Sequence, residues 1–170
     1  MRPNPLLVLL LGAWLAGTLF MWAVATQNFR LVDRLLGSPA PEAAERMRPL
    51  AAGDARLLMR YQASEANRLF FGRWGWTQLA IAAVFTVLVF GLPPDRILRA
   101  TALLMLAIAA GLQLAVVPET VRLGRLLDFA GRATPPPEAA AFWRLHHAYT
   151  ALDLVKLVLG LVAAARLVRG

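Results

Sequence analysis

The chain has 170 residues, of which 59% are hydrophobic, 16% are charged and none is cysteine. This apolar fraction exceeds the roughly 45–50% of soluble domains and favours a membrane protein. Without cysteine, disulfides, thiolate nucleophiles and Cys-ligated zinc or iron–sulfur clusters are excluded. The formal net charge is +8, but the arginines cluster beside apolar segments, which predicts contact with lipid headgroups and not with nucleic acid.

Four apolar segments of about 19 to 21 residues are predicted to cross the bilayer as helices, at residues 5–25, 74–92, 97–117 and 149–167. A helix of that length spans a hydrocarbon core of roughly 30 Å. The expected fold is therefore all-α, a polytopic membrane four-helix bundle in one domain, 1–170. The first segment resembles a signal peptide, but its apolar run is too long for one, so we expect it to remain as a span.

Helices are predicted to extend beyond the membrane on one face only. The first helix is expected to end at Gly37, where glycine is followed by prolines, and a short helix should start at Pro41. Residues 26–73 and 118–148 then form an extramembrane helical stalk. In its second half, Gly131 is the expected helix end before a proline-rich connection.

The membrane orientation is predicted from the arginines. More of them flank the long connections than flank the termini and the short turn between the second and third spans. The positive-inside rule therefore puts the stalk in the cytoplasm of a cell with a bacterial-type inner membrane. Trp74 and Trp76 are expected at headgroup level, where indole rings are enriched.

The last apolar segment carries polar residues at spacings of three and four, which places them on one face of a helix: His146, Tyr149, Asp153, Lys156 and Gly160. Asp153 and Lys156 can pair with each other inside the membrane, where an unpaired charge costs roughly 3 kcal/mol. Lys156 is the only lysine beside seventeen arginines. Two interpretations remain open, an ion pair that fixes helix rotation and a pair that handles protons or binds anions.

The two histidines, His146 and His147, are adjacent, so they point about 100° apart on a helix. His146 is a candidate axial ligand of haem iron or copper. The alternative is an interfacial histidine that bonds to a carbonyl or a headgroup. No Ser–His–Asp order, phosphate-binding glycine loop or HExxH motif is present, so neither a catalytic residue nor a metal site is predicted.

Small residues in the first span, Gly12, Ala16 and Gly17, are spaced to allow close approach by another helix. They are candidate helix-packing residues. The alternative is that they are ordinary small residues in an alanine-rich chain.

Several short motifs resemble the four-span membrane family typified by transmembrane protein 205. They are Trp14-x-x-Gly17, Val117-Pro118-Glu119-Thr120-x-Arg122 and Phe142-x-x-Leu145-His146. The layout is more distantly similar to copper-resistance D-like proteins and to protoporphyrinogen-oxidase-like four-helix proteins that bind haem. The resemblance implies four spans and, by the haem analogy, a ligand role for His146.

The function expected from the sequence is that of a non-enzymatic accessory protein or subunit of a membrane complex. Its partner would be another membrane protein or a second copy of the chain. One alternative is a haem- or metal-binding redox protein that uses His146. Another is a small proton-coupled transporter that uses Asp153 and Lys156, although four spans leave little room for a transport path.

Overall fold

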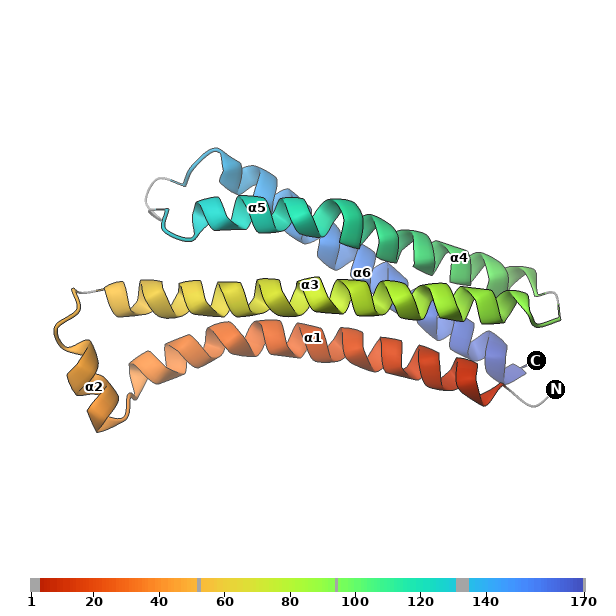
Figure 1. Cartoon of the computed structure of the whole chain (residues 1–170), viewed down its shortest axis with the longest axis horizontal. Helices are drawn as coiled ribbons and strands as arrows, with labels where there is room; N and C mark the ends of the chain where they lie inside the picture. The colour runs from red at the N-terminus through yellow and green to blue at the C-terminus, as the bar shows by residue number, and fades with distance from the viewer. Residues whose placement is uncertain (1–3, 52, 94, 131–134, 170) are drawn as a thin grey trace.

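The computed structural model describes residues 4–51, 53–93, 95–130 and 135–169, and every regular element in these ranges is helical. The predicted all-α class is confirmed. The long helices run along the length of the molecule, with both termini at one end and the short helix α2 at the other (Figure 1). The elements are α1 (Pro5–Gly37), α2 (Pro41–Met47), α3 (Asp54–Phe90), α4 (Arg96–Gly111), the π-helix η1 (Leu112–Val116), α5 (Val117–Leu127) and α6 (Glu138–Arg169).

Within the described ranges, three helical stretches are long and apolar enough to cross a membrane: Pro5–Gly37, Asp54–Phe90 and Arg96–Leu127. The fourth predicted span, at 149–167 in α6, stays a prediction. With 37 residues, α3 is about 55 Å long, against a hydrocarbon core of roughly 30 Å. The helices therefore extend well past the thickness of a bilayer. The end of the molecule that holds α2 and the C-terminal end of α5 is called the stalk end below (Figure 1).

The helix ends follow local sequence signals. Asn4 caps α1 by accepting a hydrogen bond from Leu6 N at 3.0 Å, and Asp95 caps α4 in the same way. The predicted stop at Gly37 is confirmed, because α1 ends there. Before α3, Gly53 has a φ of 100°, a left-handed conformation that glycine adopts without strain.

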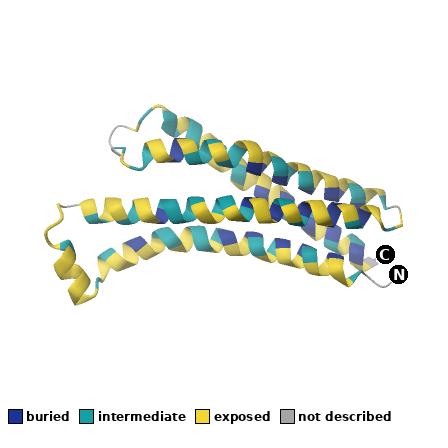
Figure 2. Cartoon of the chain, in the orientation of Figure 1, coloured by how far each residue is buried: buried dark blue, intermediate teal, exposed yellow. Residues whose placement is uncertain are grey.

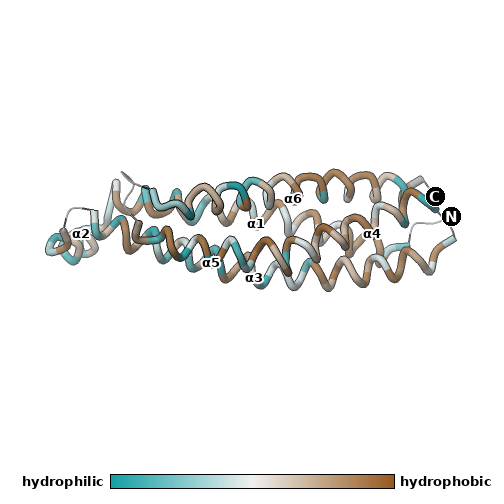
Figure 3. The backbone as a smooth tube through the Cα atoms, turned by 90° about the horizontal axis from the view of Figure 1, so that it is seen from above, coloured by the Kyte–Doolittle hydropathy of each residue, from teal (hydrophilic) through white to brown (hydrophobic). Residues whose placement is uncertain are grey.

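The rods pack in a closed order, with α1 against α3, α3 against α4, α4 against α6, and α6 against α1. α5 continues the α4 rod and lies against α6. The apolar core lies in the half of the bundle near the termini and includes Leu11, Phe85, Met105 and Ala163. Buried residues are concentrated in this half (Figure 2), and polar residues become more frequent toward the stalk end (Figure 3).

The third rod contains a π-helical segment that the sequence analysis did not predict. In η1 the N–H of Val117 bonds to the carbonyl of Leu112, five residues earlier. Proline at position 118 lacks an N–H and would crowd the preceding turn of a regular helix, and the wider π-turn accommodates it. The rod therefore continues through Pro118 to Leu127. The predicted helix end at Gly131 lies outside the described residues.

Candidate functional site

The most unusual feature of the interior is a buried ion pair on α6. The side chains of Asp153 and Lys156 are only 2% and 1% exposed. The ammonium group of Lys156 forms an ion pair with Asp153 Oδ1 and also donates a hydrogen bond to Gln78 Oε1 on α3. The structure thus brings together the two charged residues that the sequence singled out, and it adds a neutral partner from another helix.

Two tryptophans of α1 complete this cluster. Trp22 Nε1 donates to Asp153 Oδ2 at 2.7 Å, so each carboxylate oxygen has a donor. Trp14 Nε1 donates to Gln78 Oε1 at 3.4 Å, and Lys156 Nζ lies 5.9 Å from the centre of the Trp14 ring. A cation at this distance is attracted by the ring face. The ion pair therefore connects α1, α3 and α6 at one level of the bundle.

Among the described residues at this level, the amide oxygen of Gln113 has no hydrogen-bond partner. The Oε1 of Gln78 accepts from Lys156 and Trp14, and the side chain of Gln78 also shares a hydrogen bond with Tyr149 on α6. Gln113 belongs to η1, and its side chain lies over Gly75 on α3, where any Cβ would overlap it. Both glutamines are buried, at 1% and 6% exposure. Buried polar groups normally have a partner, so the Gln113 oxygen is an acceptor with unused hydrogen-bonding capacity.

The other polar residues of the α6 stripe lie toward the stalk end. Tyr149 is partly buried and packs edge-on against Phe71, with ring centroids 5.6 Å apart. One turn further on, His146 is exposed and stacks on Phe142 at 5.9 Å. Partial desolvation, and secondarily the nearby His147, lower the pKa of His146. Among the described residues, no group of three His, Cys, Asp or Glu side chains is placed to hold a metal ion.

The candidate packing residues of α1 separate into two groups. Gly17 lies directly beneath the Trp74 ring of α3, so it is used for packing inside the chain. A Cβ added at Gly12 would have no atom of the described residues within 4 Å, and Ala16 is exposed.

Trp74 thus lies between α1 and α3, whereas Trp76 is 58% exposed. The predicted headgroup level of the two indoles stays a prediction.

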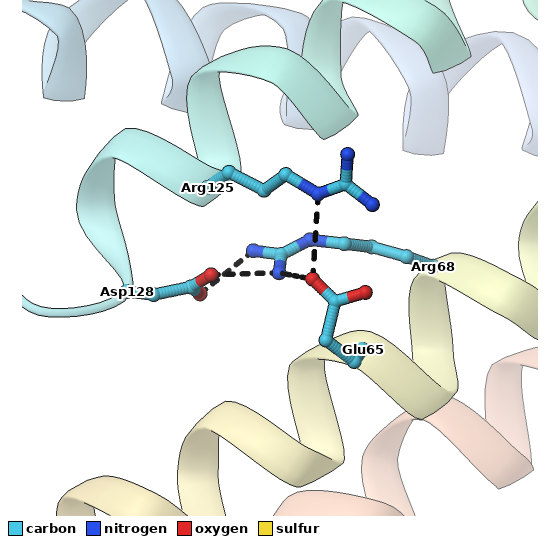
Figure 4. Close-up of polar contacts among 4 residues, drawn as sticks. All are labelled: Glu65, Arg68, Arg125 and Asp128. Atoms are coloured by element: carbon cyan, nitrogen blue, oxygen red, sulfur yellow. Dashed lines mark hydrogen bonds and ion pairs between the residues drawn. The ribbon is translucent and has the colours of Figure 1, made fainter.

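At the stalk end, α3 and α5 are joined by a network of four charged side chains (Figure 4). Arg68 donates to both carboxylate oxygens of Asp128 at 2.7 Å and to Glu65 at 2.6 Å. Arg125 donates to Glu65 at 3.4 Å. The Arg68 and Asp128 side chains are 13% and 6% exposed. Such a bidentate pair has a fixed geometry, so it sets how α5 lies on α3.

Acid is expected to loosen this contact through Glu65. The hydrogen bond from Arg68, and secondarily that from Arg125, lower the pKa of Glu65 below its ordinary 4.5. A carboxyl group whose pKa is lower in the folded protein than in the unfolded chain stabilises the fold at pH values above the unfolded pKa. For Glu65 this stabilisation is lost as the pH falls from 4.5 through the lowered pKa. The protection of the α5 amides against hydrogen exchange, measured relative to the intrinsic exchange rate at each pH, should therefore fall in that range, and less so in Glu65→Gln. Glu42→Gln on α2, which lies away from α5 (Figure 1), is the control. An identical acid response in Glu65→Gln would contradict the assignment.

Sequence reasoning missed Trp14, Trp22 and Gln78 as members of the buried cluster. Their partners lie 64 to 131 positions away along the chain, so no local spacing indicates them. The one available signal was a glutamine at position 78 within an otherwise apolar segment. Such a residue normally faces another helix, because lipid offers no hydrogen bond.

Comparisons of the chain with models of known protein families, with curated proteins and with solved structures find no match.

Proposed function

We propose that the chain is a four-span inner-membrane protein with a cytoplasmic stalk, and that it acts as a non-enzymatic subunit of a membrane assembly. Support for the first three spans comes from helices that are long and apolar enough to cross a bilayer. α6 has a comparable length of 32 residues, and its two interior charges neutralise each other. The excess of arginine beside the stalk supports the cytoplasmic placement. The likeness to the family typified by transmembrane protein 205 suggests the same layout.

The observation that carries the subunit role is an apolar patch at the stalk end. It consists of Leu57 and Tyr61 on α3 with Leu126 and Phe129 at the end of α5, and we call it the stalk patch. These side chains are 38–58% exposed, and the rings of Tyr61 and Phe129 lie 5.1 Å apart. The patch lies beyond the segments proposed to be in lipid. A grouped apolar surface in water is typical of a protein–protein contact.

The geometry of the ion pair also favours a structural role. Asp153 and Lys156 are bonded to each other and to side chains of α1 and α3. Both charges are therefore used to hold the helices in register. His146 lies in the proposed stalk beside Phe142 and Trp143, where aromatic packing accounts for its position.

The proposal is tested by purifying the native protein in mild detergent and measuring the mass of the intact complex. We expect a stoichiometric partner, either a different polypeptide or a second copy, which is lost in Tyr61→Ser/Phe129→Ser. Leu35→Ser changes an exposed leucine of α1 outside the stalk patch and should retain the partner. Recovery of a lone chain from native membranes would contradict the proposal. A Soret band in the purified protein would instead indicate a haem-binding function.

A further inference from the structure

We propose that Arg68 works as a latch, which locks the paired helices α5 and α6 onto α3 and so assembles the stalk patch from its two halves. One half is on α3, Leu57 and Tyr61, and the other is at the end of α5, Leu126 and Phe129. A partner binds the patch only while the latch is closed. This inference rests on the proposed function for the partner, and it assigns to the stalk patch the residue that controls it.

The first argument is that the contact between α3 and α5 lies outside the apolar core. The core is in the half of the bundle near the termini, where α4 packs along α3. The same rod, continued by α5, diverges from α3 toward the stalk end (Figure 1). There the network of four charged side chains and the ring pair of Tyr61 and Phe129 connect α3 to α5. How closely α5 lies on α3 therefore depends on this network.

The second argument is the fit of Arg68 into a notch of the α5–α6 pair. Its guanidinium group donates to both carboxylate oxygens of Asp128 at 2.7 Å (Figure 4). Beside it lies Gly124 on α5, where an added Cβ would be 3.1 Å from Arg68 Nη2 and 3.2 Å from Phe142 Cε2 on α6. Both distances are shorter than ordinary van der Waals contact, so the missing side chain of Gly124 makes room for the arginine. The walls of the notch therefore come from both helices of the pair.

The third argument is the position of the latch beside the stalk patch. Asp128 is directly followed in the chain by Phe129, one of the two aromatic rings of the patch. On α3, Tyr61 lies about one helical turn from Glu65, which accepts a hydrogen bond from Arg68 at 2.6 Å. When α5 moves away from α3, Phe129 leaves Tyr61 and the patch divides into two smaller surfaces. A partner that contacts both halves therefore binds with an apparent affinity proportional to the closed fraction of molecules.

The latch is tested by a distance measurement, which the absence of cysteine makes simple. Spin labels are attached at Leu35→Cys on α1 and Arg144→Cys on α6, both exposed, and pulsed electron resonance on the full chain in detergent gives their separation. Arg68→Gln should move most molecules to longer and broader distances, because the Asp128 side chain is only 6% exposed and loses its counter-charge. Arg122→Gln, which breaks an exposed ion pair within α5, is the matched control and should change nothing.

Two further variants distinguish an opened latch from a misfolded chain. Arg68→Met/Asp128→Leu removes both charges, so no buried ion is left unpaired, and the labels should return to the short distance. Gly124→Leu fills the notch and removes no charge. It also replaces glycine by a better helix former, so it should open the latch while α5 stays helical.

The same variants are then assayed for the co-purified partner. If Arg68→Gln lowers the closed form to about a tenth of the molecules, the apparent affinity for the partner should fall about tenfold. The double variant and Arg122→Gln should keep the partner. An unchanged distance in Arg68→Gln would overturn the latch, and an open Arg68→Gln that keeps its partner would overturn its control of the patch. If the unmodified protein has no partner, the proposed function and the control of the patch both fail, whereas the distances still decide whether Arg68 closes the stalk.

Discussion

Replacing Lys156 by methionine is expected to lower the free energy of unfolding by about 3–5 kcal/mol, because it leaves the Asp153 carboxylate buried without its counter-charge. Methionine keeps the length and most of the volume of the side chain, so the loss reports the charge and not a cavity. Asp153 would retain only the hydrogen bond from Trp22, at 2.7 Å, and Gln78 would lose its closest donor. The measurement is reversible unfolding of the purified protein in detergent.

The matched control is the double variant Asp153→Leu/Lys156→Met. Removing both charges together leaves no unpaired ion, and such replacements are often close to neutral. We therefore expect the double variant to recover most of the stability that the single variant loses. If Lys156→Met alone were as stable as the unmodified protein, the ion pair would not hold the helices in register.

Replacing Gly17 by alanine is expected to destabilise the contact between α1 and α3 by about 1–3 kcal/mol, the usual cost of overpacking. A Cβ at this position would lie 2.7 Å from Cζ3 and 2.9 Å from Cζ2 of Trp74. An indole ring is rigid, so either the ring or the helix must move. The measurement is the midpoint of thermal denaturation in detergent.

Gly12→Ala provides the control within the same helix. No atom of the described residues lies within 4 Å of the Cβ that this change adds, so stability should be unchanged or slightly raised. Shortening the facing ring, in Gly17→Ala/Trp74→Phe, should restore part of the loss. Equal effects of Gly12→Ala and Gly17→Ala on stability would show that the close packing of Trp74 on Gly17 does not contribute to the stability of the protein.

The positions at which helices begin and end were predictable because they depend on residues close to each other in the sequence. Gly37 ends α1 as its sequence context indicates, and α6 begins at Glu138 after the prolines. The spacing of Asp153 and Lys156 also sufficed to predict that they can pair. In each case the decisive residues lie within one or two helical turns of each other.

What the sequence did not indicate depends on how distant helices meet. Trp22 and Asp153 are 131 positions apart, and Arg68 and Asp128 are 60 positions apart. Trp74 is an aromatic residue beside the end of an apolar segment, a position typical of a lipid-facing indole. Only the close approach of α1, made possible by Gly17, turns it inward. The rotation of each helix about its own axis decides these contacts, and hydrophobic periodicity defines that rotation only loosely in a lipid-facing segment.

The π-turn in the third rod has a consequence for how this rod can change. One additional residue in a single turn advances the helical phase by about 100°, so the faces of α4 and α5 are offset from each other. The π-helix from Leu112 to Val116 therefore lets the packing face of α4 and the packing face of α5 point in different directions, although one continuous helical backbone carries both. The face of α4 can be selected for packing in the core, and that of α5 for the salt bridges to α3, without a loop between them. Loss of a residue there would leave both halves helical and yet misalign the second.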